Sequence, residues 1–411
     1  MVPLTVNGPE HHAIVKLALD RLAAPADAPV RRSGEAIFGH CMLPDEVAID
    51  LLRGRRGAWR RLFPPRVPGF TFQTDQADYR AMLPPNRFYL SRVVRELRAG
   101  RMEEAGALLG VYSHYLGDFC QPAHHYELEI GRLLPPPESL RNCNYHRMLE
   151  DVPSSVCSID HKPRLLGLNE EEALFRLDSA YRLLFDLSVG AVVPMTLAIY
   201  AGRMRDASLA LDRVVAAAAA LFSDFCHTAV SIAQRSFAGA EVRALGVCDL
   251  REIEPVACDV EYNYSRRPLI DVICVKEYGP AEKLTLRTKA GGVRRTGGIC
   301  AIPHALPVPG VDMRSLLEYR LPPDVFERFE AVVGLHASAR PQARCRFRVE
   351  TERGTLFAGG WRHCDSPAVP VRVRIGGART LRLITETDGS TDRLAYPVWG
   401  TPVLRRRAWA E

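Results

Sequence analysis

Two histidine–carboxylate pairs, each spaced four residues apart, constrain the fold of this chain more than any other feature. His114 and Asp118 form the first pair, and His146 and Glu150 form the second. Residues four apart lie on one face of a helix, roughly one turn apart. Imidazole nitrogens and carboxylate oxygens in this arrangement are ligands that Zn²⁺ prefers. The spacing therefore predicts two helical segments that both present metal ligands.

A proline and a further histidine complete the first pair in the motif HYLGDFCQPAH, which spans residues 114–124. Pro122 ends the helix because it has no N–H group to donate and its ring clashes with the preceding turn. His124 lies two residues beyond, where the chain can fold back toward His114. A buried histidine needs a polar partner, and a metal ion is one way to supply it.

Hydrophobic periodicity predicts helices throughout the first 240 residues. His11 lies at the start of the first predicted helix, and Asp45 lies in the first turn of a segment that begins at Pro44. The other predicted helices include a short one that carries the second pair. The longer ones cover residues 10–22, 86–98, 102–118, 170–187 and 205–237.

The hydrophobic pattern changes after Gly239. Short segments of alternating polar and apolar residues follow, among them LIDVICV, KLTLRT, RCRFRVE, VPVRVRI and TLRLITE. Glycine, proline and aspartate turns separate them, which is typical of a β-sandwich. We therefore predict a multidomain α and β protein, with an all-α domain over residues 1–240 and a jelly-roll-like β-sandwich over residues 241–411.

The composition is that of an ordinary soluble globular protein, with 47% hydrophobic and 25% charged residues. The net charge of +6 permits anionic substrates without requiring them. Eleven scattered cysteines indicate reduced thiols rather than a disulfide framework. The first residues lack the features of a secretion signal, and the apolar runs near 189–200 and 214–222 are short for a bilayer. We expect no transmembrane segment and a cytoplasmic location, or secretion if a leader was removed ahead of residue 1.

Six arginines lie within residues 53–66, and Trp59 lies among them. One interpretation is a solvated basic surface. The other is an anion-recruiting rim, in which Arg55, Arg56 and Arg60 contact the phosphate groups of a lipid or a nucleic acid. The sequence leaves both interpretations open.

The motif HYLGDFCQPAH resembles the metal-binding motif of the zinc-dependent phospholipase C family, which shares an all-α fold with a group of single-strand-specific nucleases. The family's second pair is His-x-x-x-Glu in the phospholipases and His-x-x-x-Asp in the nucleases, so Glu150 favours the phospholipases. The segment EHHAIVKLALD resembles the family's first helix and implies a zinc-binding role for His11. The Pro-Asp element at Asp45 resembles one that supplies an active-site aspartate. The resemblance covers about residues 8–235.

The resemblance implies up to three zinc ions and two catalytic carboxylates. Asp45 would orient or deprotonate a water molecule, and Asp118 would be shared between two metals. In the family, the third site is completed by the amine and carbonyl of the mature first residue. The implied ligand sets are Asp45, His114 and Asp118; His124, His146 and Glu150; and His11 with Asp118.

Two departures from the family pattern bear on these sites. The family has a further histidine downstream of its Pro-Asp element, whereas this chain has none between His40 and His114. Gln73, Asp75 and Asp78 are candidate replacements. No processed leader is visible, so the amine ligand of the third site has no evident counterpart. The set of His124, His146 and Glu150 is therefore the best supported.

The C-terminal part, about residues 243–408, resembles carbohydrate-binding modules of the NPCBM type. The matching phrases are GGICAIPHALP, FERFEAVVGLHASA, RCRFRVE with TLFAGGW after it, and TLRLITETDGSTDRLAYPVWGTPVL. The resemblance implies a glycan partner. Trp361, Tyr396 and Trp399 are either rings that stack on sugars or ordinary core residues, and the sequence leaves both open.

Together these features favour a zinc-dependent phosphoric-ester hydrolase, with phospholipase C-like cleavage as the first choice. A single-strand nuclease or another phosphodiesterase is the alternative among enzymes. A zinc-stabilised scaffold without catalysis, which presents a glycan-binding module, is the alternative outside them. Metal stoichiometry separates these alternatives, because one zinc per chain favours the scaffold and two or three favour an enzyme.

Overall fold

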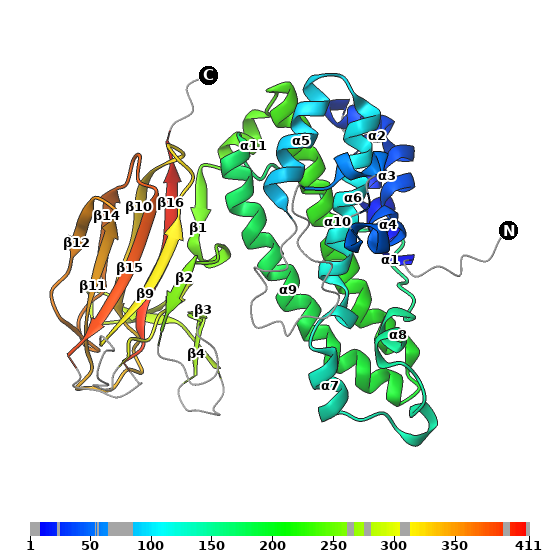
Figure 1. Ribbon diagram of the computed structural model, residues 1–411. Coiled ribbons are helices and arrows are strands. Elements are labelled where there is room, and N and C mark those ends of the chain that lie inside the picture. Colours follow the sequence, from blue (N-terminus) through cyan, green and yellow to red (C-terminus); the bar gives the residue numbers. More distant parts are fainter. Residues whose placement is uncertain are drawn as a thin grey trace. The chain divides into compact units, whose positions relative to one another are not determined.

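The computed structural model describes residues 9–22, 25–53, 55, 57–64, 85–260, 267–274, 281–304, 313–388 and 395–407. The chain divides into two compact units, Met1–Val242 and Arg243–Glu411. The first unit consists of helices and the second of β-strands (Figure 1). The predicted class, a helical domain followed by a β-sandwich, is confirmed.

The helical unit has a few long helices and several short ones, and its described residues form no β-strand. Two 3₁₀ turns, η1 (Pro25–Asp27) and η4 (Pro122–His124), each end on a buried polar residue. The short helix α11 (Gly239–Ala244) lies where the two units meet in sequence. The remaining α-helices are α1 (Pro9–Arg21), α2 (Ala28–Arg32), α3 (Gly34–His40), α4 (Leu43–Leu52), α5 (Asn86–Arg98), α6 (Met102–Cys120), α7 (Glu127–Leu133), α8 (Tyr145–Glu150), α9 (Glu170–Tyr200) and α10 (Met204–Gln234).

Helix α6 is central to the unit and is buried over most of its length. Its Tyr112 ring stacks on Phe225 of α10 with 4.1 Å between the ring centroids. Gly106 and Gly110 face α3, where an added Cβ would overlap atoms of residues 33–40. Because these glycines have no side chain, α3 packs directly against the backbone of α6. The helix that carries His114 is thus held on several sides.

Helices α9 and α10 are each 31 residues long; α10 lies close to its predicted range of 205–237, whereas α9 is longer than the sequence suggested. The prediction ended α9 near Leu187, but the helix continues through Pro194 to Tyr200. Both helices are long and apolar enough to cross a membrane by length and composition, so the expectation that these runs are too short is wrong. In α10, 83% of the apolar window is buried inside the protein, as in the core helix of a globular domain.

The second unit is a sandwich of two main antiparallel sheets, called sheet A and sheet B here. Sheet A has the strand order β14-β10-β16-β8-β3, with β1 also paired to β16, and sheet B has the order β12-β11-β15-β9-β2, with β13 also paired to β11. The strands of sheet A are β1 (Val247–Asp249), β3 (Leu269–Ile270), β8 (Gly298–Cys300), β10 (Phe326–Leu335), β14 (Val369–Arg374) and β16 (Pro397–Arg406). Those of sheet B are β2 (Ala257–Asp259), β9 (Arg314–Arg320), β11 (Arg344–Thr351), β12 (Gly354–Ala358), β13 (Arg362–His363) and β15 (Thr380–Thr387). Two hairpins complete the unit: β4 (Val272–Cys274) with β5 (Ala281–Lys283), and β6 (Thr285–Arg287) with β7 (Val293–Arg295).

Trp399 joins the two sheets at the centre of the sandwich. It lies on β16 of sheet A, and its ring packs edge-on against Phe347 of β11 in sheet B. Its Nε1 donates a hydrogen bond of 3.2 Å to Oγ1 of Thr385 on β15. The indole is fully buried, and its one polar atom is satisfied, as a buried tryptophan requires.

His227 of α10 links three helical segments at the end of the first unit. Its Nδ1 lies 2.8 Å from Oδ1 of Asp27 in η1, and its Nε2 lies 2.9 Å from Oε1 of Glu241 in α11. Burial pulls the pKa of His227 down, but the two carboxylates outweigh burial and raise it. The imidazolium therefore donates to both carboxylates, and Asp27 is almost fully buried with it.

The free energy of unfolding of the His227→Gln variant is expected to be lower by about 3 kcal/mol, because the substitution leaves Asp27 buried without a counter-charge. The pKa is raised in the folded state, so the contribution is fully present below the ordinary histidine pKa of about 6.5 and is lost as pH rises through the folded-state value. Urea unfolding followed by helical circular dichroism should show a larger deficit at pH 6 than at pH 10. The exposed His363→Gln serves as the control, and an equal deficit in both variants would contradict the role of His227.

Candidate metal centre

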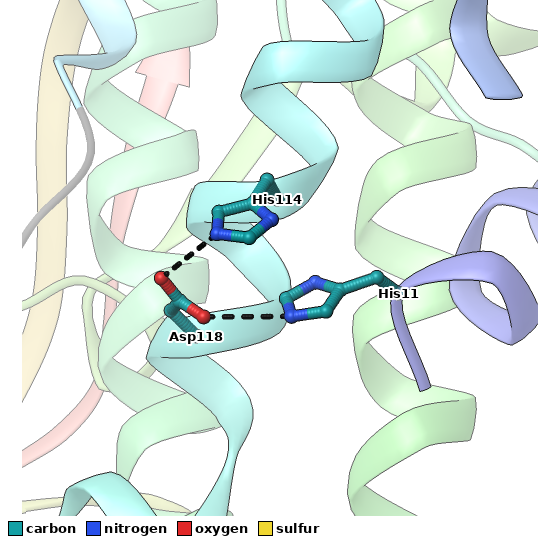
Figure 2. A group of neighbouring side chains, drawn as sticks. All are labelled: His11, His114 and Asp118. Atoms are coloured by element: carbon teal, nitrogen blue, oxygen red, sulfur yellow. Dashed lines mark ion pairs between the residues drawn. The ribbon is translucent and has the colours of Figure 1, made fainter. Parts of the chain in front are cut away.

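Four side chains from three helices form the first cluster of candidate metal ligands. Figure 2 shows three of them: His11 from α1, and His114 and Asp118 from α6. The two carboxylate oxygens of Asp118 face different histidines, with Oδ1 3.5 Å from His11 Nε2 and Oδ2 3.3 Å from His114 Nε2. Asp45 of α4 joins them, since its Oδ1 lies 3.3 Å from His114 Nε2. We call His11, Asp45, His114 and Asp118 the first group.

The orientation of His114 is fixed by a backbone carbonyl. Its Nδ1 donates a hydrogen bond of 2.7 Å to the carbonyl oxygen of Cys41, which leaves Nε2 facing Asp45 and Asp118. His114 is fully buried, and its Nε2 makes no hydrogen bond with the described residues. A metal-binding histidine characteristically donates its other ring nitrogen to a carbonyl or a carboxylate. The donor set and this unsatisfied nitrogen both fit a cation.

His11 reaches the first group because α6 has a glycine opposite it. The His11 and His114 rings are stacked, with 4.3 Å between their centroids and 9° between their planes. A Cβ at Gly117 would overlap the His11 ring. His11 can therefore contact Asp118 only because residue 117 has no side chain.

The second group consists of His124, His146 and Glu150, whose ligand atoms all lie within 4.8 Å of one another. Oε1 of Glu150 lies 2.9 Å from His146 Nε2 and 3.4 Å from His124 Nε2. His124 reaches this group through the predicted turn at Pro122. The hydroxyl of Ser188 in α9 donates a hydrogen bond to the carbonyl oxygen of Cys120, the last residue of α6, and the 3₁₀ turn η4 follows with His124 at its end. His146 and Glu150 lie four apart on α8, as their spacing indicated.

The segment after α8 has no regular secondary structure and is held to α10 by side chains. Asp212 accepts hydrogen bonds from the hydroxyls of Ser154 and Ser155. Farther along, Asp224 accepts from His161 at 2.7 Å and from Arg164 at 3.1 Å. Because this segment is bound to α10, the chain that follows the short helix α8 is held in place, which helps to fix the position of Glu150 at the end of α8.

The charges within the groups shift the pKa values of their members strongly. Burial, reinforced by the neighbouring charge of His114, lowers the pKa of His11 to about 4. Burial also acts on His114, but Asp118 and Asp45 outweigh it and raise its pKa to about 10. The histidines outweigh the effect of burial on the carboxylates, lowering the pKa of Asp118 below its usual range and that of Glu150 to about 2. Both carboxylates are therefore ionised and available to a cation at neutral pH.

The two groups are neighbours rather than separate sites. The charge of His124, in the second group, contributes to the low pKa of Asp118 and of His11 in the first. The structure thus brings together all seven residues that the sequence proposed as ligands. Two clusters of nitrogen and oxygen donors side by side can hold more than one cation and can neutralise an anionic substrate between them.

The arginines proposed as a phosphate-binding rim make mostly local contacts. Arg55 pairs with Asp50 at 3.0 Å, and Arg60 donates to the backbone carbonyls of Phe63 and Pro64. Arg56 lies outside the described residues, as do Gln73, Asp75 and Asp78, the candidate replacements for the family's additional histidine. The contacts of Arg55 and Arg60 given above are therefore to residues of their own stretch of chain rather than to either ligand group.

Two of the three aromatic residues proposed for sugar stacking belong to the core. Trp399 is fully buried between the sheets and Tyr396 is 2% exposed, so neither ring is open to a ligand. Trp399 lies on β16 and Tyr396 lies directly before it, and both side chains are buried. Trp361 is different: it is 39% exposed, and the guanidinium groups of Arg344 and Arg346 lie 6.0 and 5.1 Å from its ring centroid.

Sequence reasoning missed two residues that position the first group. One is Cys41, whose contribution is a backbone carbonyl, which no side-chain pattern reveals. The other is Gly117, which stands inside the motif between His114 and Asp118. A glycine in the middle of a buried helix destabilises it by about 1 kcal/mol relative to alanine. A glycine at such a position indicates that another group packs closely against the helix there, and this was the signal available in the sequence.

The Gly117→Ala variant is expected to lose metal from the first group and to keep it in the second. The new methyl group displaces the His11 ring, while His124, His146 and Glu150 lie on other segments. Metal analysis of the purified variant measures the change, and Gly39→Ala, where a Cβ has open space, is the matched control. Unchanged metal content in Gly117→Ala would show that His11 is not needed for metal binding.

The comparisons with known proteins give a family match in the second unit. Residues 310–405 match the family model described as NPCBM/NEW2 domain, which confirms the resemblance expected for the C-terminal part. No curated protein matches the sequence. The C-terminal part is also similar to the solved structure of CBM51 from Clostridium perfringens GH95 in complex with methyl-galactose, at 23% identity over 38% of this chain and 99% of that one, with a TM-score of 0.32.

Two solved toxins are similar over nearly the whole length. Alpha toxin from Clostridium absonum is 11% identical, covering 98% of this chain and 95% of that one, with a TM-score of 0.32. Clostridium perfringens alpha-toxin from avian strain SWCP is 10% identical, covering 97% of this chain and 98% of that one, with a TM-score of 0.29. At these TM-scores none of the structural similarities bears on activity.

Proposed function

We propose that the helical unit is a zinc-dependent phosphodiester hydrolase of the phospholipase C type. The observation that supports it is the pair of adjoining ligand groups, in which Asp118 turns one oxygen toward His11 and the other toward His114. The residues that would hold zinc are those of the first group and of the second group. When bound, zinc supplies charge neutralisation at the phosphodiester and lowers the pKa of water toward neutrality.

Asp45 is the carboxylate suited to handle the proton. It is 38% exposed, whereas His114 beside it is fully buried, so Asp45 faces the solvent side of the first group. In hydrolysis, the oxygen of water bonds to phosphorus, its proton passes to a carboxylate oxygen of Asp45, the bond from phosphorus to the leaving oxygen breaks, and the leaving oxygen takes a proton from solvent while Asp45 returns its own to solvent. A group that accepts a proton in this way typically accelerates a reaction by about 10²–10⁴-fold.

Metal content and a substrate panel test the proposal. The purified full chain should contain two or three zinc ions and should cleave a phosphatidylcholine dispersion or an aryl phosphodiester. Cleavage of single-stranded DNA but not of phospholipid would identify a nuclease instead. A single zinc ion per chain with no hydrolysis of any of the three substrates would overturn the proposal in favour of a metal-stabilised scaffold.

A second function, glycan binding by the sandwich, is supported by the family match and by Trp361. The indole of Trp361 is partly exposed, and the guanidinium groups of Arg344 and Arg346 lie over its ring; such a combination of apolar surface and N–H donors suits a sugar, which has both apolar and hydroxyl-bearing surfaces. Binding of neutral monosaccharides such as methyl-galactose should be lost in Trp361→Ala. Equal binding by the variant and the native chain would remove Trp361 from the site.

A further inference from the structure

The arginines on the two outer faces of the sandwich differ in their ion pairing. On sheet B, each arginine of β11 has a carboxylate partner: Arg346 pairs with Glu386 of β15 at 2.5 Å, Arg348 pairs with Glu350 of its own strand at 2.8 Å, and Arg344 pairs with Asp388, directly after β15. Arg382 of β15 likewise pairs with Glu318 of β9 at 2.6 Å. Opposite charges in neighbouring positions stabilise a sheet, and this face follows that rule.

On the outer face of sheet A, arginines stand opposite other arginines. In the strand register, Arg328 of β10 stands directly opposite Arg374 of β14 on one side and Arg405 of β16 on the other. Three arginines therefore form one row across three adjacent strands, and Arg372 of β14 stands next to the row, opposite Glu330. We call Arg328, Arg372, Arg374 and Arg405 the arginine face.

The acidic residues near the arginine face do not balance it. Glu330 lies 3.0 Å from Arg405 and 3.5 Å from Arg328, and it is the carboxylate that pairs with these arginines in the described part of the chain. Neither Arg372 nor Arg374 forms an ion pair with a described residue, and Glu327, at the bulge of β10, forms none either. Like charges directly opposite each other destabilise a sheet, so the row costs stability in the free protein.

We propose that the arginine face binds a linear sulfated polysaccharide whose sulfate groups lie along the row. Each guanidinium offers a planar fork of N–H donors that matches the oxygens of an oxyanion. Neighbouring strands are about 4.8 Å apart, so three arginines in a row present charges at regular intervals across roughly 10 Å. A chain with repeated anionic groups fits such a row better than a single anion does.

The other residues of this face favour a polysaccharide over a nucleic acid or a membrane. The outward neighbours of the arginines on β14 and β16 include Pro370, Thr401 and Val403, whereas Val332 of β10 packs against a hydrophobic cluster that includes Leu284 and Leu286. None of them is aromatic, so these strands offer no ring for stacking nucleic acid bases. None is a large side chain that would insert into a bilayer. The choice of a glycan also rests on the proposed glycan-binding role of this unit, whereas the anion-binding role rests on the arginines alone.

Binding of the full chain to heparin, a sulfated polysaccharide, tests the inference. The double variant Arg372→Ser/Arg374→Ser should bind at least about tenfold more weakly, and the dependence of log K on log salt should flatten by about two. The matched control is Arg294→Ser/Arg295→Ser on β7, which removes the same charge from exposed arginines elsewhere. The face variant should be at least as stable to heat as the native chain, because it removes repulsion from the row.

Equal weakening in the face variant and the control variant would mean general charge attraction and would overturn the inference. Tighter binding to phosphatidylserine vesicles or to single-stranded DNA than to heparin would overturn it as well. The outcome is separable from the proposed functions, since hydrolysis of a soluble aryl phosphodiester and binding of methyl-galactose should be the same in the face variant as in the native chain. Loss of heparin binding in the face variant alone would support the inference even if Trp361 binds no sugar.

Discussion

Asp118→Asn is expected to lower turnover at least about a hundredfold and to release metal from the first group. The amide keeps the shape of the carboxylate but removes the charge and turns one oxygen ligand into an N–H₂ donor. In the native chain the two oxygens face His11 and His114 separately, which is the arrangement of a carboxylate shared between two cations. Metal-assisted stabilisation of charge is worth several kcal/mol, and about 1.4 kcal/mol is a factor of ten in rate.

The test compares metal content and turnover of Asp118→Asn with those of Asp20→Asn, an exposed acid on α1. The second group should keep its metal in both variants because none of its ligands changes. An ordinary acid near the C-terminal end of a helix opposes the helix dipole, so replacing it with asparagine would be neutral or slightly stabilising. Full metal content and unchanged turnover in Asp118→Asn would rule out the bridging role.

Exhaustive chelation is expected to reduce phosphodiester hydrolysis by about a thousandfold or more, and added zinc should restore it. The native fold should also lose stability, since a ligand present at about a thousand times its dissociation constant contributes about 4 kcal/mol. Activity and thermal unfolding measured before chelation, after it and after reloading give both effects. Hydrolysis that survives metal-free dialysis would contradict a metal-dependent mechanism.

Reloading should depend on pH in a definite direction. In the metal-free protein the pKa of His114 is raised to about 10, so the imidazole carries a proton at neutral pH. A metal ion binds the neutral ring, and it must therefore displace that proton. Zinc binding should tighten as pH rises from 6 to 8, and it should release at least one proton to the buffer, which calorimetry in two buffers of different ionisation enthalpy would detect.

The periodic and paired features of the sequence were the ones that predicted structure well. The spacing of His114 with Asp118 and of His146 with Glu150 predicted helical pairs, and α6 and α8 carry them. The predicted end of α9 near Leu187 was too early, because burial of residues such as Met195 and Ile199 continues the helix to Tyr200, even past Pro194, where a proline usually ends a helix. Tertiary packing overrode the local preference.

The parts of the site that the sequence did not reveal depend on backbone and on distant pairing. The carbonyl of Cys41 orients His114, and no residue type encodes a carbonyl. Tyr396 and Trp399 looked like candidates for sugar contacts because aromatic rings suit both a core and a sugar. Only the pairing of β16 with β10 and β8 shows that this strand lies inside sheet A, where Trp399 and the adjoining Tyr396 are buried.

The contact of His11 with Asp118 has a consequence for the connectivity of the chain as well as for chemistry. These two residues belong to α1 and α6, and roughly a hundred residues of chain run between them. A cation held by both closes that length into a loop, as a disulfide would, and so reduces the entropy of the unfolded chain. Unlike a disulfide, this metal-mediated link is broken by loss of the ion. The attachment of the first helix to the rest of the unit would then follow the supply of metal.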